Sequence, residues 1–164
     1  MTQQEYAPPQ PTAEHKKLLE ATGTWNVDCT FYVDPSQPPM KTKGKETVKP
    51  FGEFWTTSTF EADLGGMPFQ GTCTIGYEPH NKRWVSTWFD VCSPSLFYMT
   101  GNFDKSGKTL TMKGHGLNCA TGKDSECRTV DKWTSPDDHT VEMFATMPDG
   151  KEAKLFTNVY KRKR

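Results

Sequence analysis

Asp90 is the residue of this sequence with the clearest opportunity for chemistry, because it stands two positions after Trp88 in the polar and aromatic segment 88–94. Side chains two apart on a strand point to the same side of the sheet. An inward Trp88 therefore brings an inward carboxylate, which needs a partner when it is buried. Arg128 is the partner that we expect. Such a pair would serve as a polar anchor for the head group of a ligand or as an internal salt bridge, and both readings stay open.

Four histidines provide further acids, bases or metal ligands: His15, His80, His115 and His139. None has a second histidine at metal-ligand spacing, so the sequence predicts no metal site. His80 and His139 fall in predicted turns, whereas His115 ends a predicted strand. An enzyme would use Asp90 or His115 as its acid or base, and a haem protein would need one axial histidine. Phosphate loops and nucleophile elbows are missing, so we predict no cofactor and favour a protein that is not an enzyme.

Aromatic rings must supply much of the core, since twenty aromatic residues and seven Met stand against one Ile, seven Leu and eight Val. Rings and thioethers pack by edge and face geometry rather than by volume filling alone. Rings that face one cavity would bind an apolar or planar ligand, and otherwise they only pack the core. The candidates for a ligand-binding lumen are Trp25, Trp55, Phe69, Trp88, Tyr98 and Trp133, together with Asp90, His115 and Arg128.

Turn residues recur at short, regular intervals after Gly23, and nine reversals rich in Gly, Pro, Asn, Asp and Ser separate ten segments. The segments are enriched in β-branched and aromatic residues, which predicts an antiparallel meander. The predicted strands are 24–33, 41–50, 54–62, 69–78, 83–91, 95–104, 108–116, 125–135, 139–147 and 152–161. A flat sheet of this width would leave long exposed edges, so closure into a barrel is expected. A ten-strand barrel is too wide to be filled by its own side chains, and an internal cavity follows.

One domain is expected over residues 12–164, preceded by a polar, proline-containing arm at 1–11 that is disordered or extended. Thr12 can cap a helix that runs to about Thr22, and Gly23 is suited to end it. The first strand then begins with Trp25. The all-β class with one short N-terminal helix follows from this order of elements.

Charge and cysteine usage exclude several classes of function. Lys plus Arg equals Asp plus Glu, so no global field favours nucleic acid. No apolar run approaches the roughly 20 residues of a membrane helix, and the N-terminus has no signal-peptide core. Five cysteines with no such signal indicate a cytoplasmic protein with free thiols. Cys119 and Cys127 could pair, although passive thiols are the favoured reading.

Several blocks of the sequence resemble one family. They are 14–19 (Glu-His-Lys-Lys-Leu-Leu), 23–25 (Gly-Thr-Trp), 31–40 (Phe-Tyr-Val-Asp-Pro-Ser-Gln-Pro-Pro-Met), 46–48 (Glu-Thr-Val), 65–71 (Gly-Gly-Met-Pro-Phe-Gln-Gly), 76–78 (Gly-Tyr-Glu), 87–90 (Thr-Trp-Phe-Asp) and 93–94 (Ser-Pro). The chain resembles the uncharacterised bacterial family filed as domain of unknown function 1579, over about residues 13–162. This resemblance implies a calycin-like barrel, similar to lipocalins and fatty-acid-binding proteins, with a helix closing one mouth. It also implies that Trp25 closes the barrel floor beneath Lys161 or Arg162. It implies no reaction or ligand.

The favoured function is therefore the binding of a small hydrophobic or planar molecule in the lumen, gated by the helix and the loops 34–40 and 63–68. A structural or interaction protein with a filled barrel, such as a homodimer, is the alternative. An enzyme or a haem-binding barrel that uses the same cavity is a further alternative.

Overall fold

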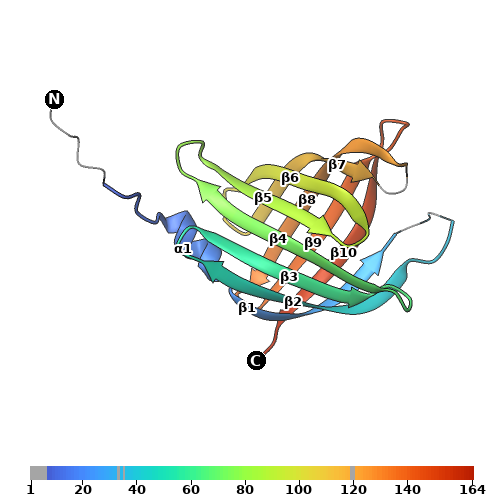
Figure 1. Ribbon diagram of the computed structural model, residues 1–164, viewed down its shortest axis with the longest axis horizontal. Helices are drawn as coiled ribbons and strands as arrows, with labels where there is room; N and C mark the ends of the chain where they lie inside the picture. Colours follow the sequence, from blue (N-terminus) through green and yellow to red (C-terminus); the bar gives the residue numbers. More distant parts are fainter. Residues whose placement is uncertain (1–6, 33, 35, 119–120) are drawn as a thin grey trace.

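Ten antiparallel strands form one closed barrel in the computed structural model, which describes residues 7–32, 34, 36–118 and 121–164. One helix precedes the barrel, and Figure 1 shows it at the end opposite the β3–β4 hairpin. The elements are α1 (Ala13–Leu19), β1 (Gly23–Phe31), β2 (Met40–Phe51), β3 (Trp55–Asp63), β4 (Pro68–Glu78), β5 (Arg83–Asp90), β6 (Ser93–Phe103), β7 (Thr109–Asn118), β8 (Lys123–Ser135), β9 (Asp138–Thr146) and β10 (Glu152–Arg162). The predicted class and the ten-strand closed barrel are confirmed.

Each strand pairs with its neighbours in sequence, and β1 closes the ring by pairing with both β2 and β10. The predicted strands lie within a few residues of the observed ones. Part of the predicted arm, residues 1–6, and part of the β7–β8 turn, residues 119–120, lie outside the described residues. Among the residues described, no helix has the length and apolarity needed to cross a bilayer.

Helix α1 is shorter than the predicted 12–22 and is attached to the barrel through His15, whose side chain is only 2% exposed. The Thr12 N–H donates to His15 Nδ1 over 2.9 Å. The proton of the neutral ring therefore resides on Nε2, which donates to the Tyr77 carbonyl over 3.1 Å. The ring also contacts Phe54 edge to face. These contacts hold a seven-residue helix that could not persist alone.

The floor of the barrel is built around Trp25 and Arg162. Gly23 is the first residue of β1 and does not end the helix. Glycine is required at this position, because the φ of +141° is rarely adopted by other residues and a Cβ there would lie 2.8 Å from Arg162 Nη1. The Arg162 guanidinium lies 4.2 Å from the centroid of the Trp25 ring. The expected pairing of Trp25 with a basic residue from the last strand is thus made by Arg162.

Two hydrophobic clusters fill opposite parts of the barrel. One joins β5 to β9 and α1, with Trp84, Phe97 and Met112 among its buried members. The other lies on β1, β3 and β10 around Trp25 and Phe60. Trp88 is only partly buried and packs against both clusters. It therefore stands at the boundary between the two packed regions.

Candidate functional site

Several inward-facing side chains of the barrel keep accessible surface. The Asp131 side chain points inward beside His139 yet keeps 22% of its surface accessible. Glu46, Cys73 and Met143 also face inward and are only partly buried. Burial is nevertheless deep enough to raise the pKa of both Glu46 and Cys73. These inward-facing side chains therefore keep accessible surface between the two hydrophobic clusters, although none of them lines either of the two clefts described below.

Six polar side chains gather on this inward face near the floor, and we call them the interior polar cluster. They are Glu46, Ser58, Asp131, His139, Asn158 and Tyr160. His139 is central, because the cross-strand register places Trp133, His139 and Tyr160 side by side on β8, β9 and β10. The imidazole stacks on Trp133 at 4.2 Å and on Tyr160 at 4.4 Å between ring centroids. The Trp25 ring meets its edge at 4.9 Å.

Asp131 fixes the orientation of this histidine. Its Oδ1 lies 2.7 Å from His139 Nδ1, and its Oδ2 accepts a hydrogen bond from Trp133 Nε1 over 3.0 Å. An ionised carboxylate at Nδ1 keeps a proton on that nitrogen. The remaining nitrogen, Nε2, is then the one that can exchange a proton with a bound molecule. An aspartate and a histidine in this relation are suited to acid–base chemistry as well as to ligand recognition.

Glu46 is the second interior carboxyl group. Burial raises its pKa, and a hydrogen bond from the Ser58 hydroxyl, the charge of His139 and a hydrogen bond from Tyr160 oppose this effect. The pKa of Tyr160 is raised far above its ordinary value, first by burial and then by the charge of Glu46. Tyr160 is therefore a neutral hydrogen-bond donor at physiological pH.

Asn158 contributes an unsatisfied acceptor. Its side chain is 6% exposed, and its Oδ1 has no hydrogen-bond partner among the described residues. It lies opposite Cys29 and Val141 in the ladder, so it points into the barrel, and it interacts with Tyr160. Buried polar atoms are usually paired, and this unpaired acceptor is itself enclosed, so a ligand donor would reach it only where neighbouring side chains move apart.

Three rings form an aromatic wall along the same interior: Phe60, Phe69 and Trp88. Phe69 and Trp88 are stacked with their centroids 6.4 Å apart, and Phe60 lies 6.0 Å from Phe69. Gly71 leaves room for this arrangement, since a Cβ there would come within 2.2 Å of the Trp88 ring. The indole Nε1 donates to Asp90 Oδ2 over 2.8 Å, which fixes the ring.

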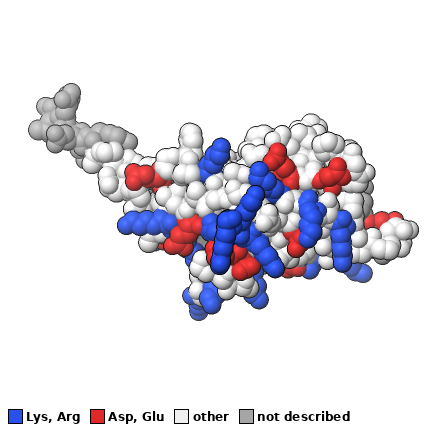
Figure 2. All heavy atoms as spheres, turned by 90° about the horizontal axis from the view of Figure 1, so that it is seen from below, with Lys and Arg blue, Asp and Glu red and all other residues white. Residues whose placement is uncertain are grey.

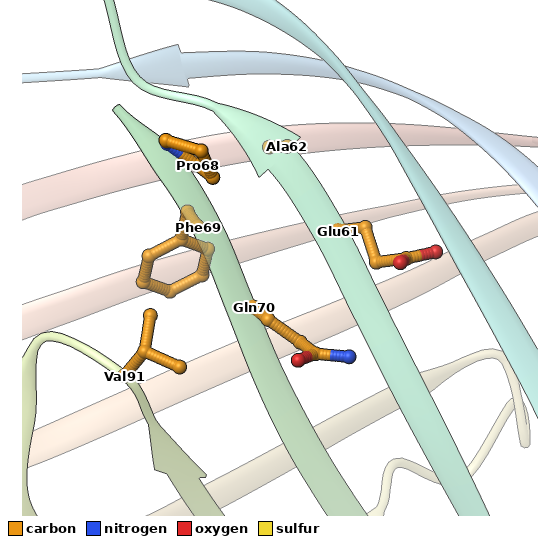
Figure 3. Close-up of a pocket in the computed structure, with 6 residues that line it drawn as sticks. All are labelled: Glu61, Ala62, Pro68, Phe69, Gln70 and Val91. Atoms are coloured by element: carbon orange, nitrogen blue, oxygen red, sulfur yellow. The ribbon is translucent and has the colours of Figure 1, made fainter. Parts of the chain in front are cut away.

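A cleft of about 480 Å³ opens at the barrel end opposite the helix, and we call it the rim cleft. Figure 3 shows its lining residues on β3 and β4 and at the end of β5: Glu61, Ala62, Pro68, Phe69, Gln70 and Val91. Ala62 and Phe69 pair on the inward face, whereas Glu61 and Gln70 pair on the outward face. The cleft therefore spans the rim, and Phe69 belongs both to its lining and to the aromatic wall.

A smaller cleft of about 320 Å³ lies between α1 and strands β4 to β6. Tyr77, Trp84 and Phe103 line it with rings, and Lys17 Nζ sits 3.9 Å from the Phe103 centroid. Lys17 also donates to the Gly107 carbonyl, so its ammonium is held in place. The helix forms one wall of this cleft through Glu14 and Lys17.

A family profile described as "Protein of unknown function (DUF1579)" matches residues 10–162. The chain belongs to the DUF1579 family. The resemblance noted from the sequence is confirmed, and the family's description names no activity. No curated protein matches the sequence significantly.

Solved structures show the same fold as the DUF1579 barrel. Rv2717c from M. tuberculosis is similar with a TM-score of 0.71 at 11% identity, covering 94% of this chain and 100% of the other. The S-type phycobiliprotein lyase CPES from Guillardia theta is similar with a TM-score of 0.61 at 10% identity, covering 93% and 94% of the two chains. At these identities, the likeness concerns the fold alone.

Five of the nine lumen candidates face the interior of the DUF1579 barrel. They are Trp25, Phe69, Trp88, Asp90 and Trp133. Trp25 and Trp133 border the interior polar cluster, and Phe69 and Trp88 belong to the aromatic wall. Asp90 binds the indole of Trp88 and the backbone N–H of Cys92 rather than an arginine.

The other four candidates lie on the outer face: Trp55, Tyr98, His115 and Arg128. Trp55 covers Gly76 from outside, with inward Thr56 next to it in the strand. Tyr98 is 46% exposed and pairs with His115, which lies near Asp124. Arg128 donates two hydrogen bonds to Glu152. The expected Asp90–Arg128 pair is therefore wrong, because the Arg128 side chain lies on the outer face of β8 whereas Asp90 lies on the inner face of β5.

Sequence reasoning missed the interior polar cluster itself. His139 was assigned to a turn, yet it is the second residue of β9 and shares the inward parity of Val141 and Met143. Glu46 carries a clearer signal, because the lysines of β2 occupy the alternate, exposed positions 41, 43, 45 and 49. Glu46 has the same parity as Thr42 and Val48, so the alternation of the exposed lysines predicts that it faces inward.

Cysteines are not part of a described metal or disulfide site. Cys29, Cys73, Cys92 and Cys127 are free thiols. Cys119, named above as a partner for Cys127, lies outside the described residues. Within the described ranges, no three His, Cys, Asp or Glu side chains gather as metal ligands do.

Proposed function

We propose that this protein binds a small, largely apolar or planar molecule inside its barrel. The observation that carries the proposal is the accessible surface kept by inward-facing residues, above all Asp131 with 22% of its side chain accessible. Ligand sites are typically apolar hollows that contain a few convergent polar groups. The aromatic wall and the interior polar cluster supply these two components.

The two components imply an orientation for the ligand. Its planar body would lie against Phe69 and Trp88, and its polar end would reach the interior polar cluster. The rim cleft would admit it, since Phe69 belongs both to that cleft and to the aromatic wall. Stacking on fixed rings favours planar molecules over flexible chains, because less conformational freedom is lost.

Native mass spectrometry of gently purified protein, beside the same sample denatured, is the direct test. We expect a mass excess that disappears on denaturation and identifies the compound. The same spectrum gives the oligomeric state. If the native spectrum shows only the mass of the protein, the next experiment is a titration with 8-anilinonaphthalene-1-sulfonate and with an uncharged naphthalene, followed by tryptophan fluorescence.

A pair of leucine substitutions locates the site. Ser86 faces inward between Ile75 and Met99 in the ladder, whereas Thr87 faces outward. Ser86→Leu should fill part of the interior and weaken ligand binding about tenfold, which corresponds to about 1.4 kcal/mol. Thr87→Leu adds a similar side chain outside and should leave binding unchanged. Unchanged binding in a folded Ser86→Leu variant would place the ligand elsewhere and refute the proposal.

Acid–base catalysis in the same interior is the second candidate, and the 2.7 Å contact between Asp131 and His139 favours it. Its test is the exchange of ligand C–H protons for deuterium in D₂O, followed by NMR, once a ligand is known. His139→Gln should abolish the exchange and still bind the ligand. Equal exchange rates in the wild type and in His139→Gln would refute catalysis by His139 and leave ligand binding as the proposed function.

A further inference from the structure

We propose that the interior site selects ligands whose polar end is an amine or an N–H-bearing heterocycle, and that it discriminates against carboxylates of the same shape. This inference rests on the proposed function and adds the chemical class of the ligand. It follows from which charges face inward, which donors are already used, and which acceptor is left unpaired.

Among the described residues, the inward face around the interior polar cluster carries two acids and, besides His139 and the engaged Arg162, no basic side chain. Glu46 and Asp131 face inward, whereas the lysines of β2 are exposed on the outer face. Figure 2 shows one side of the molecule, where Lys and Arg side chains spread over the surface with Asp and Glu among them. Arg128 and Lys154 are likewise engaged outside, with Glu152 and Glu142. A ligand carboxylate would therefore meet like charges in the barrel.

Arg162 has the inward parity, but its side chain makes four hydrogen bonds to described residues at the floor of the barrel. Its guanidinium donates to the carbonyls of Thr22, Glu20 and Pro136 and to the Asp137 carboxylate. The Trp25 ring separates it from the interior polar cluster, since Trp25 contacts Arg162 with its face and His139 edge to face. An incoming carboxylate would have to break this network to use Arg162 as its partner.

The protonation states of the interior polar cluster do not change this conclusion. With Asp131 ionised, the sum of the charges on Glu46, Asp131 and His139 is zero at most, when Glu46 is neutral and His139 is protonated. It becomes negative as soon as Glu46 ionises or His139 loses its proton. Tyr160 stays neutral, because burial raises its pKa. The cluster thus offers no net positive charge to an anion.

Hydrogen-bonding capacity points the same way. With His139 neutral, the donors of the cluster are already used within it: Ser58 and Tyr160 donate to Glu46, and Trp133 and the Nδ1–H of His139 donate to Asp131. The unpaired group is an acceptor, Asn158 Oδ1, in a side chain that is 6% exposed. A ligand N–H would satisfy it, whereas a carboxylate has no proton to donate. Because the acceptor is already unpaired in the free protein, an N–H that reaches it gains the free energy of one hydrogen bond, which a carboxylate does not.

Three naphthalenes with the same body test the inference: 1-naphthylmethylamine, 1-naphthaleneacetamide and 1-naphthaleneacetic acid. Their affinities are measured by fluorescence titration and by calorimetry at pH 7 in moderate salt. We expect the amine to bind about tenfold more tightly than the carboxylate, with the amide in between. Equal or tighter binding of the carboxylate, while all three bind, overturns this inference and leaves the proposed function standing.

Glu46→Gln tests the origin of the preference, because it removes the charge and keeps the shape of the side chain. We expect the ratio of amine to carboxylate affinity to fall about fivefold, and any change in affinity that is common to the two compounds cancels in this ratio. Glu126→Gln removes the same charge from an exposed position of β8 and should leave the ratio unchanged. An unchanged ratio in Glu46→Gln contradicts the assignment. Failure of all three compounds to bind the wild-type protein overturns the proposed function itself.

Discussion

The guanidinium of Arg162 lies over the face of Trp25, 4.2 Å from the ring centroid, and joins the last strand to the first. Through its hydrogen bonds it also ties together the carbonyls of Glu20, Thr22 and Pro136. These carbonyls belong to the segment after the helix and to the β8–β9 turn. The Arg162 side chain therefore stabilises the closure of the barrel, where the first strand pairs with the last.

Replacing Arg162 should accordingly destabilise the whole barrel. Arg162→Met should lower the free energy of unfolding by about 3 kcal/mol, because it removes several charge-assisted hydrogen bonds and the cation–π contact. Arg162→Lys should recover only part of this loss, since an ammonium cannot reproduce the planar fork. Urea denaturation measures both. Lys161→Met, at the exposed neighbouring position, should stay within about 0.5 kcal/mol of the wild type.

Strand number and closure were predictable because local signals and topology agree in this chain. Turn residues recur between segments of strand length, and each strand pairs with its neighbour in sequence. The family resemblance implied that Lys161 or Arg162 would contact Trp25, and the structure shows that Arg162 does so. The interior polar cluster was not predicted, because its members come from five different strands and only the barrel register brings them together.

Strand parity explains the four candidates that lie outside. Trp55, Tyr98, His115 and Arg128 were grouped with Trp88 by residue type, although a shift of one residue reverses the face of a strand. Tyr98 follows Phe97, which is the inward partner of Trp88. Gly76 allows Trp55 to lie flat on the outer surface. Chemistry alone could not separate the two faces of these strands.

Glu46 should make stability depend on pH. Burial raises its pKa above the ordinary 4.5, so the folded protein holds this proton more tightly than the unfolded chain does. The contribution of Glu46 to stability should therefore fall as pH rises from about 4.5 through the raised pKa, and remain low above it. Other ionisable side chains also contribute to the pH dependence, so the effect of Glu46 is isolated by difference.

Glu46→Gln is the variant for that difference. We expect it to gain stability relative to the wild type as pH rises through this window, measured by urea denaturation at a series of pH values. Glu126→Gln provides the comparison for an exposed carboxylate. A difference between Glu46→Gln and wild type that is constant with pH would be incompatible with a raised pKa at Glu46.

His15 should determine whether α1 stays on the barrel. Both ring nitrogens are engaged, with the Thr12 N–H and the Tyr77 carbonyl, and the side chain is 2% exposed. His15→Ala should cost about 2 to 4 kcal/mol, from lost packing and from the unpaired Tyr77 carbonyl. Limited proteolysis should also cut near α1 sooner. Lys16→Ala, on the exposed side of the helix, should show neither effect.

Thiol reactivity should report whether the interior exchanges freely with solvent. Burial raises the pKa of Cys29 to about 11 and raises that of Cys73 further still, with the charge of Glu46 adding to the second shift. At pH 8 roughly a thousandth of Cys29 would be thiolate, the reactive form, and Cys73 would have less. Cys92 is exposed on the β5–β6 turn and should react first.

Iodoacetamide labelling at pH 8 followed by peptide mass mapping makes this comparison within one sample. We expect Cys92 to be alkylated at least about a hundredfold faster than Cys29, Cys73 and Cys127 in the folded protein. In 8 M urea, all four should react at similar rates, because the difference comes from burial. Labelling of Cys73 as fast as Cys92 in the folded state would mean that the barrel interior is freely open to water. Glu46 lies close to Cys73, because Ser58 is opposite Cys73 in the ladder and donates a hydrogen bond to Glu46. Fast labelling of Cys73 would therefore also contradict the burial that raises the pKa of Glu46.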